Sequence, residues 1–394
     1  MIDHDTFFHE RKPAAVMKHG ILRHYTTVFT TMLGSRASEV WVVDAYAGPG
    51  EYAGDEHTAP APGSPRIVCN VADAVKNCQV RGYFIEQDPA QAEQLRALIE
   101  SMNAGDQHIV QAGAAEEHLQ TALSKAGAAP VLLFLDPFGV ALSFDALVAA
   151  LSARPRGALT EILLNFNVES VRRIGGYLSK EKLKNDPVLV RVDNFVGGDW
   201  WRAVFLGARA EDEHGRAAVA AQAVVEKFNA KMKARLGLES IAVPIRRRPG
   251  TAPLFVLNLY FRNATAAYVF ADAASGASRD WREFHKRQKD SALPDDSLFP
   301  MEMLQDMSDQ LFNEQEATLA TEWVTTIKEN IRRLLADTSE VRILDHVREL
   351  YGQALGQARE MHLRQAWDAL TAEGGTQKRE SGRIRGQAIR RAAA

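Results

Sequence analysis

The sequence is poor in cysteine and lacks a long apolar run. Its 394 residues include two cysteines, Cys69 and Cys78, too few for a disulfide framework. No Cys-x-x-Cys pair or Cys/His cluster surrounds them, so no metal site is predicted. No apolar run reaches the roughly 18 residues that a membrane span needs. The first twenty residues carry acids and histidines instead of the basic start and apolar run of a signal peptide, so we expect a cytoplasmic protein.

Neither sign of charge dominates. Lysine and arginine number 47 against 50 aspartates and glutamates, and 46% of the residues are hydrophobic. This balance is typical of globular proteins, and any surface for a polyanion has to be local. The length favours two or three structural units.

Apolar strands alternate with helical patterns over the first 167 residues. A helix is expected at 13–33, and strands are expected at 40–46, 82–88, 108–113, 131–136 and 161–167, with helices between them. Ser64 and Pro65 mark a helix start, which leaves a long loop at 51–63. Strict alternation predicts right-handed βαβ crossovers and an α/β fold with a mainly parallel, doubly wound sheet.

The rest of the chain divides into three parts. Residues 168–238 are charged and helical, and we interpret them as an inserted cap. A β-rich run at 253–263 and a following helix complete a first domain at 1–300. Residues 301–394 form a second, mostly helical module, with short amphipathic helices at 339–350 and 362–374 and a basic tail at 376–391.

Glycines and acids follow the first strands. The stretch VVDAYAGPG places Asp44 at a strand end, and Ala47, Gly48, Pro49 and Gly50 form the turn after it. Glycine permits positive φ and close approach of a ligand, as in the first turn of nucleotide-binding folds. A tight turn in any α/β protein could use the same residues.

The next two strand ends extend this candidate site. Glu86, followed by Gln87, ends the second strand, where an acid can accept both ribose hydroxyls of a nucleoside. The alternative for Glu86 is a solvated turn residue. The third strand ends at Gly113 and Ala114 with no acid directly after it, so recognition of a base there would use the backbone or another side chain.

The fourth strand runs into Asp136, Pro137, Phe138 and Gly139. Asp136 and the rigid Pro137 carbonyl could each accept an N–H of an amine, and Phe138 could stack on a base. The plainer interpretation is an Asp-Pro turn that closes a buried strand.

Asn165 and Asn167 follow on the next strand and could line the same cleft or cap the strand end. We class both, with Gly139, as candidate substrate-binding residues.

In order, the motifs DAYAGPG, GSP, FIEQDP, LFLDPFG, LLNFN and PLFVLNLYFRN resemble the three-Cys-motif partner protein family, TcmP. The resemblance spans most of the chain, except 168–238. It implies a Rossmann-like class I methyltransferase fold that binds S-adenosylmethionine, with a C-terminal winged-helix-like module. It also implies a possible cysteine-rich partner protein. DPFG is similar to the Asp-Pro-Pro-aromatic motif of amino-group methyltransferases, although Phe-Gly replaces the Pro-aromatic pair.

The C-terminal module gives the local basic surface that the overall charge lacks. Arg364 would lie on its second helix, and Lys378, Arg379, Arg383 and Arg385 in a wing or tail suited to phosphate contacts. A nucleic-acid partner, DNA or tRNA, is therefore one expectation. A solvated tail or a protein-binding module is the alternative.

The leading hypothesis is an S-adenosylmethionine-dependent methyltransferase that acts on an amino group of a nucleic-acid base, with no metal. Two alternatives stay open. One is a non-catalytic protein that binds the cofactor and a cysteine-rich enzyme, and the other is methylation of a small molecule or protein.

Overall fold

The computed structural model describes residues 12–54, 60–137, 139–183, 185–291 and 300–392. The chain divides into two compact units, one formed by 1–15 and 26–262 and the other by 16–25 and 263–394. The division therefore falls at Arg262, ahead of residue 300 where the sequence pattern placed it. Helix α11 (Ala264–Asp290) is the cause, because its buried alanine-rich face packs within the second unit.

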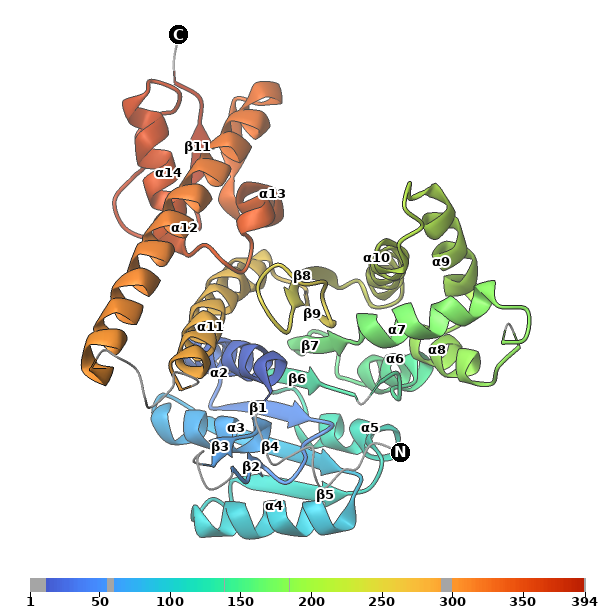
Figure 1. Ribbon diagram of the computed structural model, residues 1–394. Coiled ribbons are helices and arrows are strands. Elements are labelled where there is room, and N and C mark those ends of the chain that lie inside the picture. Colours follow the sequence, from blue (N-terminus) through green and yellow to red (C-terminus); the bar gives the residue numbers. More distant parts are fainter. Residues whose placement is uncertain (1–11, 55–59, 138, 184, 292–299, 393–394) are drawn as a thin grey trace. The chain divides into compact units, whose positions relative to one another are not determined.

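A seven-stranded sheet forms the centre of the first unit, in the order β5-β4-β1-β6-β7-β9-β8 (Figure 1). Its strands are β1 (Glu39–Asp44), β4 (Gln79–Glu86), β5 (His108–Ala112), β6 (Val131–Leu135), β7 (Thr160–Phe166), β8 (Glu239–Ile245) and β9 (Phe255–Phe261). Pairs among the first five are parallel, whereas β9 runs antiparallel to both β7 and β8. Strand order reverses between β1 and β6. The predicted doubly wound, Rossmann-like class I methyltransferase fold is confirmed by this topology.

Helices cover both faces of the parallel part of the sheet (Figure 1). Alternate β1 residues point to opposite faces: Val42 packs with α3 (Ser64–Ala74) and α4 (Pro89–Ser101). Trp41 and Val43 pack with α5 (Ala115–Lys125) and α6 (Phe144–Ser152). Burial on both faces explains why these strands are apolar throughout.

The segment between β7 and β8 is helical, as predicted for 168–238. It contains α7 (Val168–Gly175), the 3₁₀ turn η1 (Gly176–Ser179), α8 (Val188–Val196), α9 (Trp200–Glu211) and α10 (Ala217–Leu236). Their apolar side chains join the core on the α5/α6 face. Strand β8 was not predicted, because Pro244 interrupts its pattern. Proline is tolerated there because β8 is an edge strand.

The predicted loop at 51–63 contains a short antiparallel pair, β2 (Glu51–Tyr52) and β3 (Ala61–Pro62). Gly63, not Ser64, occupies the N-cap position of α3, and Ser64 is the first helical residue. The helix start was therefore predicted one residue late. The Ser64 side chain is buried.

The second unit contains part of α2 (Pro13–Gly34), α11, and α12 (Met301–Asp337). Beyond them lie β10 (Glu340–Arg342), η2 (Ile343–Asp345), α13 (Val347–Tyr351), η3 (Gly352–Ala354), α14 (Glu360–Ala372) and β11 (Ala388–Arg390). The predicted helix at 339–350 is wrong in its first half, which is β10 paired with β11. Among the helices that the structure describes, none is long and apolar enough to cross a membrane.

Candidate functional site

The predicted cofactor residues meet at the carboxyl edge of the parallel strands. Asp44 ends β1 and Glu86 ends the neighbouring β4, so the register of two parallel strands brings the two acids to one edge. Both side chains are buried. The edge lies where strand order reverses between β1 and β6, the position at which doubly wound sheets bind ligands.

The glycine turn is fastened to β4. The Ala47 N–H donates to the Ile85 carbonyl at 3.0 Å, and the Gly48 N–H donates to Glu86 Oε2 at 2.7 Å. Gly48 has φ +65° and Gly50 has φ +93°, so the turn uses a backbone region that other residues rarely adopt. At Gly50 a Cβ would also lie 2.5 Å from Leu98 Cδ2. The turn therefore requires glycine for its backbone conformation at Gly48, and for both its conformation and the lack of space at Gly50.

Glu86 holds two loops at once. Its Oε1 accepts the Asp88 N–H at 2.8 Å while Oε2 accepts Gly48. An ionised carboxylate offers about four lone-pair positions, so it retains capacity for two further donors. Gln87 is exposed. The Gly113 N–H donates to the Glu86 carbonyl at 2.9 Å, which brings the end of β5 to the same edge.

Asp44 is fully buried with one unsatisfied oxygen. Its Oδ1 accepts the Tyr46 N–H at 3.1 Å, whereas Oδ2 has no hydrogen-bond partner among the described residues. Burial raises the pKa of Asp44 from 3.8 to about 7, the nearby Ser64 hydroxyl and Tyr46 N–H lower it, and Asp136 and Glu86 raise it. A buried acceptor of this kind fits a donor or cation supplied by a ligand.

Asp136 follows β6 and is held by Asn165 of β7. The Asn165 Nδ2 donates to Asp136 Oδ1 at 2.6 Å, across 29 residues of sequence. Parallel pairing of Leu135 with Leu164 places the two side chains next to each other. Asn165 is buried, and its Oδ1 has no partner within the described part of the chain. Asp136 and Asn165 therefore form a fixed pair of hydrogen-bond acceptors at the same edge.

The remaining residues predicted for the site do not all contribute a side chain to this edge. Pro137 is buried and Gly139 has φ +71°. Phe138 lies outside the described residues. Asn167 is the N-cap of α7, where its Oδ1 accepts the Ser170 N–H at 2.8 Å, the capping role left open from the sequence. Ala114 is the N-cap residue of α5 and makes no side-chain bond.

Two residues near the site were missed by sequence reasoning. Tyr46 is half-buried, and burial, followed by the charges of Glu116 and Asp136, raises its pKa. It therefore lies close to the Asp136 carboxylate. Ser64 lies near Asp44, as its influence on the Asp44 pKa shows. Tyr46 lies in the motif DAYAGPG and Ser64 in the motif GSP, but their closeness to Asp136 and Asp44 depends on how the turn at Gly48 folds back.

No protein-family model and no curated protein matches the chain. Solved structures match parts of it. The O-methyltransferase from Bacillus cereus in complex with S-adenosylhomocysteine is 13% identical, over 61% of this chain and 80% of that one, with a TM-score of 0.32. The O-methyltransferase TomG from Streptomyces achromogenes, in complex with S-adenosylmethionine, is 16% identical over 61% and 78%, also with a TM-score of 0.32. Protein LPL1258 from Legionella pneumophila is 13% identical over 64% and 86%, with a TM-score of 0.35. These scores are too low to bear on function.

Proposed function

We propose that this protein is an S-adenosylmethionine-dependent methyltransferase that acts on an amino group of a nucleic-acid base. The observation that carries the proposal is the arrangement of acceptors at one sheet edge, where Asp44, Glu86 and Asn165 are buried and Asp136 is half-buried. Asp44 and Glu86 flank the Gly48 turn, Asp136 directly follows β6, and Asn165 lies on the neighbouring β7. The motif order supports membership of the TcmP family.

The cofactor half would use Glu86 and Asp44. Glu86 already accepts the N–H groups of Gly48 and Asp88, and its remaining lone pairs suit a pair of ribose hydroxyls. Asp44 Oδ2 suits a donor, and a bound cation would favour its ionised form. Bound S-adenosylmethionine would supply an electrophilic methyl group on a sulfonium sulfur. The positive φ of Gly48 lets the backbone approach such a ligand closely.

The acceptor half would use Asp136, Asn165 and the Pro137 carbonyl. An exocyclic amine of a base is a poor nucleophile because its lone pair is delocalised into the ring. Two fixed acceptors would hold its N–H groups and orient the lone pair toward the methyl donor. Asn165 holds the Asp136 carboxylate before any substrate arrives, so little reorganisation is needed.

The first test is calorimetric titration with S-adenosylmethionine and S-adenosylhomocysteine. We expect micromolar binding. Glu86→Gln leaves one acceptor oxygen for two backbone donors, so it also disturbs the turn. Titration with adenosine and with 2′,3′-dideoxyadenosine, which lacks both ribose hydroxyls, separates lost ribose binding from a disturbed turn. If Glu86 binds the ribose, the preference for adenosine is large in the wild-type protein and lost in the variant.

The second test is methyl transfer from labelled S-adenosylmethionine to DNA, tRNA and small amines. Asp136→Asn keeps an oxygen for Asn165 but removes the charge, so we expect a 10²–10³-fold lower rate with unchanged cofactor binding. Asp106→Asn, an exposed carboxamide change elsewhere in the unit, serves as the control. Cofactor binding without transfer to any acceptor would favour the non-catalytic partner of a cysteine-rich enzyme. Transfer to amines but not to nucleic acids would favour a small-molecule or protein substrate.

A further inference from the structure

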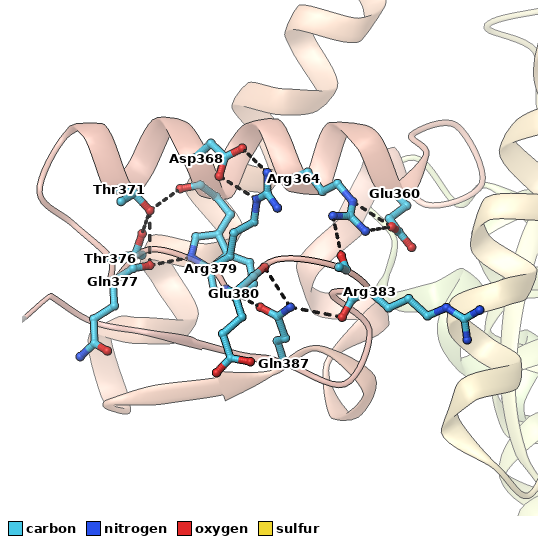
Figure 2. A network of polar contacts seen from close by, with 12 residues as sticks. Glu360, Arg364, Asp368, Thr371, Thr376, Gln377, Arg379, Glu380, Arg383 and Gln387 are labelled. Carbon is cyan, nitrogen blue, oxygen red and sulfur yellow. Dashed lines mark hydrogen bonds and ion pairs between the residues drawn. The ribbon is translucent and has the colours of Figure 1, made fainter.

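The basic segment at 377–387 is a fastened loop and not a frayed tail. The Trp367 Nε1–H donates to the Gln377 carbonyl at 2.9 Å, and Ile384 is fully buried. The Gln387 side chain donates to the carbonyls of Glu380 and Arg383 and accepts the Glu380 N–H. Figure 2 shows the Gln387 contacts closing the loop.

The loop lies between an isolated β-bridge at Thr376 and strand β11 of a two-stranded sheet. Strand β11 pairs antiparallel with β10, and Arg391, the residue directly after β11, forms an antiparallel bridge with Thr376. Along the chain the order is α12, β10, α13, α14, the Thr376 bridge, the loop and β11. A helix, a strand, two helices and a basic hairpin that returns to the sheet is the order of a winged helix, with α14 as the second helix of the pair and 377–387 as the wing.

Two of the basic residues are neutralised inside the module. Arg379 forms a two-bond ion pair with Asp368 of α14, at 2.8 and 3.0 Å. Arg364 Nε donates to Glu360 at 2.8 Å, and its Nη1 donates to the Gly382 carbonyl at 2.9 Å (Figure 2). These arginines position the loop against α14, so they are poorly placed to give their charge to a partner.

The remaining cations of the loop stay available. Within the described residues, Lys378, Arg383 and Arg385 have no ion-pair partner, although Arg385 is near enough to Glu360 to help lower its pKa. The Arg383 side chain extends away from the polar network (Figure 2). The loop holds four basic residues against one acid, a net charge of +3 in a chain whose total is −3.

We propose that this module binds duplex DNA, with the wing cations Lys378, Arg383 and Arg385 on backbone phosphates and α14 in the major groove. We infer phosphate groups as the partner because the loop presents cations but no exposed large apolar side chain. Because the loop is already held by hydrogen bonds, it loses little conformational entropy on binding. Helix α14 exposes Met361, Gln365 and Asp368 on one face. The major groove of B-form DNA admits a helix, whereas that of A-form RNA is deep and narrow. This inference does not depend on methyl transfer.

Fluorescence anisotropy of a labelled 30-base-pair duplex with the full chain, between 50 and 200 mM KCl, tests it. Each phosphate contact contributes about 0.9 to the slope of log K against log salt, so the Lys378→Ala/Arg383→Ala/Arg385→Ala variant should lose about 2.7 from it. Arg287→Ala, which removes an exposed arginine of α11 that is paired with Glu283, is a control outside the loop and should leave the slope unchanged. Circular dichroism verifies that the triple variant is folded.

A gain-of-function variant excludes a folding artefact. Asp368→Asn removes a negative charge from α14 and releases Arg379, so DNA binding should tighten several-fold and its slope steepen by about 0.9. The proposal is overturned if the triple variant binds like the Arg287→Ala control, or if Asp368→Asn does not tighten binding. Competition by duplex RNA as strong as that by duplex DNA would also overturn it. None of these outcomes depends on S-adenosylmethionine.

Discussion

Replacing Asp44 with asparagine should make the first unit more stable relative to the wild type as the pH rises. Burial raises the pKa of this carboxyl from 3.8 to about 7. Between these values the folded protein holds a proton that the unfolded chain has lost. Wild-type stability therefore falls as the pH rises through this window. The asparagine variant has no such titration, so the difference between the two proteins isolates this group.

The magnitude follows from the same two values. The interval from 3.8 to about 7 corresponds to about 4 kcal/mol, at about 1.4 kcal/mol per pH unit. Asparagine retains an oxygen for the Tyr46 N–H, but its amide would replace the Oδ2 that has no partner in the described structure. An unsatisfied amide costs about 1–3 kcal/mol, which does not change with pH. The variant should thus be equal or less stable at pH 4 and more stable at pH 8.

Urea denaturation of both proteins at half-unit intervals from pH 4 to 8 measures this difference. The free energy of unfolding of the variant minus that of the wild type should increase with pH by an amount on the order of 4 kcal/mol and stop increasing above about pH 7. Asp106→Asn, at an exposed position, should show no such growth. A difference between Asp44→Asn and wild type that stays constant over this range would refute the reasoning, since Asp44 would then be ionised throughout.

Two other changes test the geometry of the site. Gly113→Ala should destabilise the first unit by about 1–3 kcal/mol in urea denaturation, because Gly113 has φ +134°; Gly105→Ala, in open space, should have little effect, and equal values would show that the strain argument is wrong. Asn165→Ala should lower kcat for methyl transfer at least tenfold without changing S-adenosylhomocysteine affinity, because Asp136 loses the donor that orients it. A loss of cofactor affinity of the same size would instead show that Asn165 supports the whole sheet edge.

Strand-to-helix alternation was predictable because burial on both faces makes parallel strands apolar throughout, and the helices between them carry their own amphipathic period. The positions of Asp44 and Glu86 followed from the same pattern, since residues that end adjacent parallel strands meet at one edge. Pro244 hid β8, and the strand preference of 340–342 was concealed by the apolar spacing around it. Strand β10 also depends on a pairing partner about 50 residues away, β11, which local pattern does not encode.

By itself, the sequence determined the fold class, the glycine turn and which acids end which strands, because these depend on local periodicity and backbone preference. Tertiary structure alone decided that Asn165 holds Asp136 and that Glu86 fastens the Gly48 turn, across 29 and 38 residues of sequence. It also decided which arginines of the C-terminal module are available, since Glu360 neutralises Arg364 of α14 and Asp368 neutralises Arg379 of the basic segment. Such pairings depend on strand register and helix packing, which are set by the whole core and not by neighbouring residues.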